Sequence, residues 1–176
     1  SGILGSNTSS ARLSEADLTS VSKLQNIDAA GGVMQLDSSI ARGEKKRNIK
    51  VLAVGEDYLE LTRQKLTSGQ FFGGNLENNN TVILASNVAQ ELFGSDDPIG
   101  SSVTIRGTNF VIIGVLDASK GFNLGRPIND LVLIPLPTGK MLNQDTAQLQ
   151  QITVKVKDIN QSKATAEAIN DALLKN

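Results

Sequence analysis

The sequence predicts a mixed α/β fold of the α+β type. Strand-like and helix-like segments alternate along the chain, as they do in domains that pack helices on a sheet. Hydrophobic residues make up 39% and charged residues 20% of the 176 residues, close to the averages of globular domains. A chain of this length buries roughly 70% of the surface it exposes when unfolded, enough for one core or two small ones.

The composition excludes several classes of function. Lys and Arg total 17 against 18 Asp and Glu, so no basic field attracts nucleic acid. Aromatic residues are 3% and Trp is absent, which disfavours base stacking. Because Cys and His are also absent, Cys–His and Ser–His–Asp catalysis, thiolate or imidazole zinc sites and haem ligation through either side chain are ruled out. We therefore expect no metal and no cofactor.

The first predicted helix lies within LSEADLTSVSKLQNI, residues 13–27. Ser14 is the expected N-cap, and Asp17 lies at the third helical position, near the positive end of the helix. The apolar residues then recur at three-residue steps and form one stripe, made of Leu18, Val21 and Leu24. This stripe predicts a helix that lies on a core.

Two strands joined by a charged turn are expected next. VMQLDSSIA (33–41) and NIKVLAVG (48–55) are strand-like, and the Gly and charges of RGEKKR (42–47) suit an exposed hairpin tip. The basic residues Lys45, Lys46 and Arg47 could contact anionic lipid or a partner. Such a run is more often a solvated turn that protects a sheet edge from aggregation, and we favour that interpretation.

The segment EDYLELTRQKLTSGQFFGGNLENNN (56–80) combines a short helical turn around Tyr58–Leu61 with glycines and an asparagine run that indicate loops. Because the composition changes here, we predict a subdomain boundary near residues 63–68. TVILA (81–85) is a continuous apolar run, as expected for a strand buried on both faces.

A short helix is predicted over SNVAQELFG, with Ser86 as its cap and Gly94 just past its end. SVTIR (102–106) and NFVIIGVLDA (109–118) then read as a hairpin. Gly107-Thr108 between them fits a two-residue type II′ loop with glycine first.

Asp96 and Asp97 are the most conspicuous candidates for acid–base catalysis. Adjacent carboxylates in a turn usually point apart, whereas catalytic pairs come from separate elements. The stretch DPIG instead places Asp97, Pro98 and Gly100 at the favoured positions i, i+1 and i+3 of a type I turn. We therefore interpret these residues as a structural turn, and a hydrolase using Asp96 and Asp97 or a Ser–Lys pair remains the rival hypothesis.

The segment SKGFNLGRPIN (119–129) reads as an exposed loop. Phe122, Leu124 and Arg126 combine apolar side chains with a guanidinium, a composition typical of interface anchors. They are our candidates for partner contact, and the alternative is a loop folded back on its own core.

The rest of the chain alternates strand and helix. DLVLIPLP (130–137) reads as a buried strand closed by prolines, TGKMLNQDTAQL (138–149) as a short helix and QITVKVK (151–157) as a half-buried strand. Residues 158–176 read as a helix capped by Asp158. Its predicted buried stripe consists of Ala166, Ile169 and Leu173.

The order of these segments resembles the extracytoplasmic domain of macrolide-exporter-type ABC permeases, the MacB-like family that also includes FtsX-like and LolC/LolE-like permeases. The matching stretches cover nearly the whole chain: LSEADLTSVSKLQNI, VGEDYLELTRQKLTSGQFF, VILASNVAQELFGSDDPIGSSVTIRGTNFVIIGVL, DLVLIPL and ITVKVKD. The most specific stretch is 89–116, where a Leu-Phe-Gly helix end, the Asp-Pro-Ile-Gly turn and the VIIGVL strand follow in the family's order and spacing.

The resemblance implies a cell membrane protein whose extracytoplasmic domain, periplasmic or extracellular, is represented by this chain. Residues 1–12 would be a linker following a transmembrane helix. Residues 13–65 and 128–176 would form a porter-like βαβ sandwich from both chain ends, and residues 66–127 a smaller inserted mixed α/β subdomain, often called Sabre.

The resemblance also implies a non-catalytic role. Such a domain would transmit ATP-driven conformational change and dock a periplasmic or cell-surface adaptor (membrane-fusion) protein, for efflux of drugs, peptides or toxins. The implied partners are that adaptor, a second permease copy and a cytoplasmic ATPase domain or subunit, while the isolated domain would be monomeric. A lipoprotein-releasing or FtsX-like permease is the alternative within the superfamily. The family has no catalytic residues here to transfer.

Overall fold

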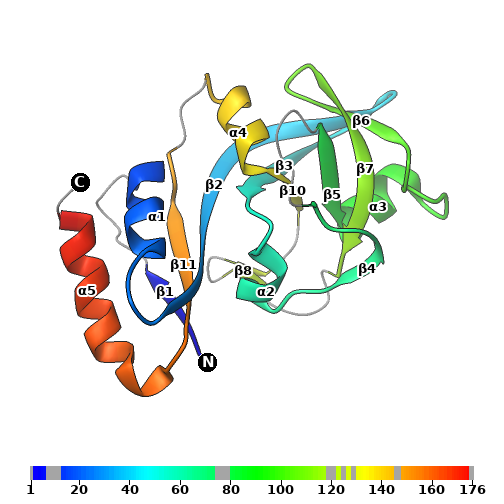
Figure 1. The fold of residues 1–176 in the computed structure, drawn as a ribbon. Coiled ribbons are helices and arrows are strands. Elements are labelled where there is room, and N and C mark those ends of the chain that lie inside the picture. The colour runs from blue at the N-terminus through cyan, green and yellow to red at the C-terminus, as the bar shows by residue number, and fades with distance from the viewer. Residues whose placement is uncertain are drawn as a thin grey trace.

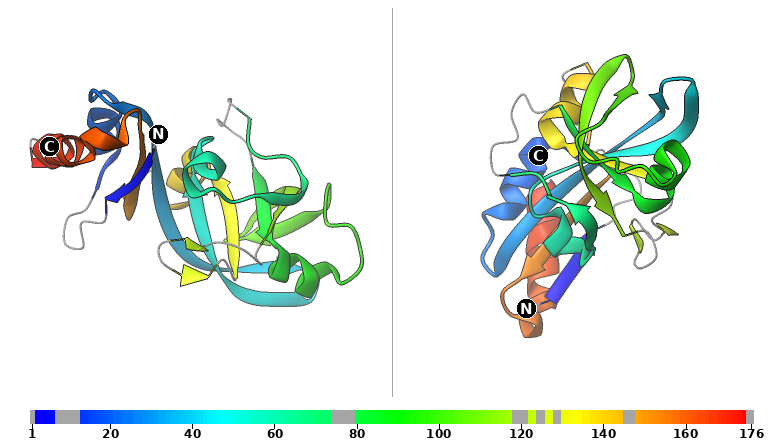
Figure 2. Two further views of the ribbon diagram at one scale, coloured as in Figure 1. Left: turned by 90° about the horizontal axis from the view of Figure 1, so that it is seen from below. Right: turned by 90° about the vertical axis from the view of Figure 1, so that its right-hand side faces the viewer.

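The computed structural model describes residues 2–6, 13–73, 80–117, 122–123, 126–127, 130–144 and 148–174. Two lobes lie side by side and are joined by one long curved strand, β2 (Ile27–Arg42), as Figure 1 and the left view of Figure 2 show. Among the described residues, none of the helices has both the length and the apolar character that a membrane span requires.

The first lobe, here called the terminal lobe, contains both ends of the chain. Its sheet consists of β1 (Gly2–Ser6), β11 (Gln151–Val156) and the first part of β2, all antiparallel. Two helices, α1 (Glu15–Ser22) and α5 (Ser162–Leu174), lie side by side against this sheet (Figure 1). A single 3-10 turn, η1 (Ile159–Gln161), leads into α5.

The second lobe, here called the central lobe, is a closed barrel. Its six strands follow the order β2, β3, β10, β5, β7 and β6, and β6 pairs with β2 to close the ring. The remaining barrel strands are β3 (Lys45–Val54), β5 (Thr81–Ala85), β6 (Ser102–Ile105), β7 (Thr108–Leu116) and β10 (Leu131–Pro135). The ladder that closes the ring is short, with Ile40 paired to Ile105 and Ala41 to Thr104.

Short elements surround the barrel. They are α2 (Tyr58–Thr62), β4 (Leu66–Gly69), α3 (Ser86–Phe93), the two-stranded hairpin β8 (Phe122–Asn123) and β9 (Arg126–Pro127), and α4 (Leu136–Leu142). Strand β4 extends the sheet beside β7. Helix α4 packs on β2, β3 and β10, and α3 packs on β5 and β7.

Buried apolar side chains form one continuous cluster through both lobes. The largest fully buried residues come mostly from barrel strands: Phe110, Met34, Ile40, Leu52, Ile83, Leu84, Ile105, Ile112, Leu116, Leu133 and Ile134. The barrel interior is therefore a packed core rather than a channel, as expected for a small barrel. The predicted mixed α/β fold class is confirmed.

The predicted subdomain bounds (13–65 with 128–176, and 66–127) stay a prediction. The barrel takes β2, β3 and β10 from the first set and β5, β6 and β7 from the second, so hydrogen-bonded ladders connect the two sets. Strand β1 lies within the predicted linker at residues 1–12.

Local signals predicted several elements correctly. Helix α1 begins after Ser14, whose hydroxyl accepts from the Asp17 amide while Asp17 accepts from the Ser14 amide, so both halves of the capping box are formed. The buried strand at 81–85 and the helical turn at Tyr58 are also confirmed. Gly94 follows α3 with a φ of +59°, which glycine adopts without strain.

One predicted helix cap and one predicted hairpin loop are each wrong by one residue. Ser86 is the first helical residue of α3, so Ala85 occupies the N-cap position and supplies no side-chain cap. In the β6–β7 hairpin, Ile105 pairs with Thr108, which leaves Arg106-Gly107 as the loop rather than Gly107-Thr108. Both loop residues have positive φ, +50° and +76°, as in a type I′ turn rather than type II′.

The turn after Asp97 also differs from the predicted type I turn. The amide of Ser101 donates to the carbonyl of Pro98 at 3.1 Å, so the hydrogen-bonded turn starts at Pro98. Gly100 then occupies its third position with a φ of +87°, as type II turns require. The Asp97 carboxylate accepts from the Ile99 amide at 3.0 Å, an Asx turn that leads into this turn.

Helix α5 buries two of the three residues of the predicted stripe: Ile169 is buried and Leu173 packs partly buried against the core. Ala166 is exposed, and its neighbour Thr165 is buried instead. The reason is a polar contact across the lobe: the Asn26 amide donates to the Thr165 hydroxyl at 2.8 Å and to the Asp158 carbonyl at 3.0 Å. The Asp158 side chain caps η1, the turn before α5, as its position predicts.

Candidate functional site

The partner-contact candidates lie at a small hairpin beside the barrel. Phe122 pairs with Pro127 and Asn123 with Arg126 in the β8–β9 ladder, which brings the backbones of Phe122 and Arg126 together. Leu124 lies outside the described residues. A role of Phe122, Leu124 and Arg126 in partner contact stays a prediction.

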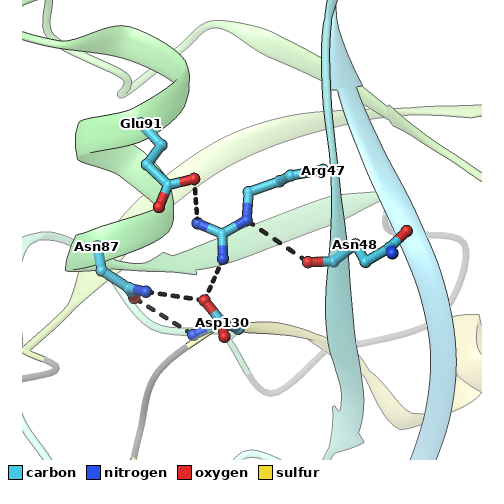
Figure 3. A network of polar contacts seen from close by, with 5 residues as sticks. All are labelled: Arg47, Asn48, Asn87, Glu91 and Asp130. Carbon is cyan, nitrogen blue, oxygen red and sulfur yellow. Dashed lines mark hydrogen bonds and ion pairs between the residues drawn. The ribbon is translucent and has the colours of Figure 1, made fainter.

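Asp130, which ends the segment that contains this hairpin, belongs to an ionic network around Arg47 (Figure 3). The guanidinium is paired with Asp130 and lies 2.6 Å from Glu91 of α3. The contact with Glu91 lacks hydrogen-bond geometry and is therefore an ion pair only. Only 17% of the Arg47 side chain is exposed, against 59% for Glu91 and 49% for Asp130, so the cation is the buried member.

This position corrects the interpretation of Lys45, Lys46 and Arg47 as a solvated turn. The hairpin tip is only two residues long, and all three basic residues belong to β3. Lys45 and Lys46 are exposed, but Arg47 pairs with Ile40 in the ladder and lies half-buried beneath α3. A long-range ion pair, which no local pattern indicates, decides the role of Arg47.

Asp130 fixes the place where the chain re-enters the barrel. Its backbone is left-handed, with a φ of +63°. Its carbonyl accepts from the Lys50 amide at 2.8 Å, and its carboxylate accepts from the Asn87 side chain at 3.1 Å (Figure 3). A polar groove of about 680 Å³ lies beside it along the β2–β3 hairpin, lined by Asp37, Ser38, Ser39, Asn48, Ile49, Lys50 and Asp130.

The arrangement does not favour catalysis. Asp96 and Asp97 are both exposed, and the Asp97 carboxylate is used by the turn. Lys140, one of the lysines available for a Ser–Lys pair, donates to Glu15 at 3.0 Å. Within the described part of the chain, no group of three or more acidic side chains is placed to hold a metal.

The junction between the lobes is the second candidate site. Residues 27–33 of β2 pair with β11, and residues 33–42 pair with β3. In these two registers Val33 is the one shared residue, facing Gln151 in one ladder and Val54 in the other. The sheet therefore passes from one lobe to the other through a single strand.

A glycine pair precedes Val33. A Cβ on Gly31 would lie 2.7 Å from Cδ1 of Leu61 in α2, and a Cβ on Gly32 would lie 2.8 Å from Cδ1 of Leu149. Because neighbouring strand residues face opposite sides, the two leucines fill opposite faces of β2. The strand has no side chains of its own here, and leucines from both lobes pack directly on its backbone.

Polar contacts cross the junction on both flanks. Lys140 of α4 pairs with Glu15 of α1 at 3.0 Å, and Lys155 of β11 pairs with Glu60 of α2 at 2.6 Å. The hydrogen bond with the Glu60 carboxylate raises the pKa of Lys155. All four side chains keep contact with solvent, with exposed fractions between 24% and 52%, so each pair is weak.

The sequence reading missed this junction. The signal that could have indicated it is Gly31-Gly32 at the start of a strand-like run, because glycine inside a strand often marks a bend or a close approach. The ion-pair partners lie 125 and 95 positions apart, respectively, and no local pattern connects residues at that distance.

Comparison with known proteins identifies the family. Residues 2–172 match the family model described as the MacB-like periplasmic core domain. The chain belongs to this family. As a MacB-like periplasmic core domain, it is an extracytoplasmic domain of an ABC transporter permease.

Curated relatives support the MacB-like assignment. A "Macrolide export ATP-binding/permease protein MacB" of Chlorobium luteolum is 29% identical over 171 residues, which cover 94% of this chain and 25% of the relative. A protein of the same name from Chlorobium phaeobacteroides is 31% identical over 144 residues, covering 80% of this chain and 21% of the relative. The chain thus spans about a quarter of the length of the MacB relatives that it matches.

Solved structures share the fold. The periplasmic region of MacB from Actinobacillus actinomycetemcomitans superposes with a TM-score of 0.80 at 19% identity, covering 97% of this chain and 80% of that one. The extracellular domain of the ABC-type transporter YknZ from Gram-positive bacteria gives a TM-score of 0.77 at 18% identity, covering 96% and 91%. At these identities the likeness concerns the fold alone.

Proposed function

We propose that this MacB-like domain transmits ATP-driven conformational change from a permease and docks a periplasmic or cell-surface adaptor protein during efflux of drugs, peptides or toxins. The partners in this proposal are the adaptor, a second permease copy and a cytoplasmic ATPase domain or subunit. The domain itself contributes no chemistry, which agrees with its lack of Cys and His and with the exposed position of Asp96 and Asp97.

The observation that carries the transmission half is the single-strand junction. Both chain ends lie in the terminal lobe, and β2 alone continues the sheet into the barrel (Figure 1). In this proposal a displacement applied at the chain ends moves the terminal lobe, and β2 carries the movement to the barrel. Packed elements that rearrange as bodies are a common basis of such transitions.

The docking half concerns the segment that ends at Asp130. It contains Phe122, Leu124 and Arg126, and apolar residues beside an arginine are frequent anchors at interfaces. The base of the segment is fixed to the barrel by Arg47 and Asn87. A firmly anchored base supports docking, because pre-organised contacts lose less entropy on binding.

The test uses the full-length permease and titration with the adaptor encoded near it. We expect Phe122→Ala and Arg126→Ala each to weaken adaptor binding at least tenfold, since interface anchors typically contribute more than about 1.4 kcal/mol. The matched control is Val111→Ala, which truncates an apolar side chain that is 44% exposed on β7.

Thermal unfolding of the same variants separates docking from packing. If Phe122→Ala lowers the melting temperature sharply while adaptor affinity is unchanged, the segment packs on its own core and the docking half is wrong. Unchanged affinity in both variants with unchanged stability would also reject it. Loss of affinity in Val111→Ala of the same size would show that the effect is not specific to the segment.

A further inference from the structure

We infer that the two lobes are joined by a hinge at Gly31–Val33 of β2, held closed by two surface ion pairs that act as a latch. The pairs are Lys140–Glu15 and Lys155–Glu60. The inference deepens the proposed transmission role by assigning the place at which the lobes move and the contacts that regulate the movement.

The location follows from the hydrogen-bond ladders. On the terminal side of Val33 the strand β2 is paired with β11, and on the central side it is paired with β3. A bend at Gly31–Val33 therefore disturbs only the end of the β11 ladder and the first pair of the β3 ladder, whereas a bend elsewhere in β2 would break the middle of a ladder. Gly31 and Gly32 have wider backbone freedom than any other residue type, so the strand is most deformable where the pairing changes.

The latch follows from the contacts on both sides of this point. Helix α2 carries Glu60 to Lys155 and places Leu61 over Gly31. Helix α4 carries Lys140 to Glu15 on α1. The Gln150 side chain adds a hydrogen bond, because its oxygen accepts from the Gln35 amide at 2.6 Å where the β11 ladder ends.

The strength of the latch suits a reversible movement. Each pair is exposed to water, and exposed ion pairs contribute little individually and weaken in salt. Arg47 provides the contrast: its ion pairs join β3, α3 and Asp130 within the central lobe, and its side chain is only 17% exposed. The two ion pairs that cross the junction are therefore contacts that can separate at a small cost in free energy.

The experiment measures the distance between the lobes in the chain as it is. The sequence contains no cysteine, so two introduced cysteines are the only sites for spin labels. Lys163→Cys on α5 and Ser102→Cys on β6 report the inter-lobe distance by double electron–electron resonance, and both positions are exposed. A second pair, Ser102→Cys with Gln90→Cys on α3, reports distances within the central lobe.

Removing the latch should change only the inter-lobe distance. In Lys140→Gln/Glu60→Gln, which leaves the Lys155–Asp28 pair within the terminal lobe in place, we expect the population of the open arrangement to rise roughly 2- to 25-fold, from two exposed pairs. The unmutated chain in about 1 M salt should show the same trend, because the screening length falls to about 3 Å. The matched control is Glu91→Gln, which weakens an ion pair that does not cross the junction.

Three results of these distance measurements would overturn the hinge. An inter-lobe distribution that is the same in the double variant, in high salt and in the unmutated chain would overturn the hinge. Equal broadening of the pair within the central lobe, or an equal effect of Glu91→Gln, would also overturn it, because the change would then be general loosening. The measurement involves no adaptor and no permease, so its failure leaves docking intact, and loss of docking leaves the hinge intact.

Discussion

Replacing Gly139 by alanine is expected to destabilise the protein, although alanine is the better helix former. Gly139 is buried in α4 where the helix lies against β3. A Cβ at this position would overlap the Cβ of Ala53 and lie 3.0 Å from Cε of Met34, whereas carbon atoms pack at about 3.5–4.0 Å. The Met34 methyl can move, but Ala53 belongs to a fully buried strand position and cannot.

The size of the effect is a difference of two contributions. Gly→Ala inside a helix gains about 1 kcal/mol, and overpacking in a rigid site costs about 1–3 kcal/mol or more. Because the obstructing atom is rigid, we expect the upper part of that range and a net loss of about 1–2 kcal/mol in the free energy of unfolding.

Urea unfolding measured by circular dichroism tests this expectation. Gly55→Ala is the matched control, because a Cβ there meets no atom within 4 Å, and it should be neutral or stabilising by up to about 1 kcal/mol. The double variant Ala53→Gly/Gly139→Ala should recover stability relative to the sum of the two single changes, with a coupling of about 1–3 kcal/mol. A Gly139→Ala protein at least as stable as the unmutated one would refute the close-packing argument.

Three further predictions concern polar side chains. Arg47→Met should lower the free energy of unfolding by about 1–3 kcal/mol in urea titrations, because it removes charge-assisted contacts. Lys46→Met, at the exposed neighbouring residue, should change the free energy of unfolding by less than about 0.5 kcal/mol. Equal effects of the two changes would contradict a stabilising role of the Arg47 network. Burial and two nearby glutamates raise the pKa of Asp57, so ionisation of this carboxyl weakens the folded state. Asp57→Asn should therefore raise the free energy of unfolding near pH 7 by less than about 1 kcal/mol and have no effect below about pH 3, where the carboxyl is protonated. The reverse pH dependence would be inconsistent with a raised pKa. The Tyr58 hydroxyl is buried beside Gln64 without a hydrogen bond of good geometry, and this burial raises its pKa. Tyr58→Phe should therefore be neutral or stabilising by up to about 1–2 kcal/mol in thermal unfolding. A clear loss of stability would reveal a hydrogen bond to the Gln64 amide or to an internal water.

Signals that act over a few residues were readable in the sequence. The Ser14 and Asp17 capping box, the alternation of Ile152 and Val154, and the glycine after α3 each depend on neighbours within one turn or one strand. Physical chemistry at that range is encoded in the order of residues alone. The structure confirms these three features, whereas the predicted Ser86 cap, the β6–β7 loop and the turn at Asp97, which are also local, each differ by one residue.

A contact with a distant residue displaced one predicted position. The hydrogen bond from Asn26, 139 positions away in the sequence, turns Thr165 inward in place of Ala166. The helical pattern of α5 carries no signal of that partner.

The sequence by itself determined that this is a mixed α/β domain without the Cys and His side chains on which thiolate or imidazole chemistry depends, because composition and hydrophobic period are properties of the chain alone. Only the tertiary structure decided that six strands close into a barrel, that Arg47 is half-buried under α3, and that the lobes meet at Val33. These features arise from pairing between strands far apart in sequence. Such pairing is chosen by the packing of the whole chain, and no local segment encodes it.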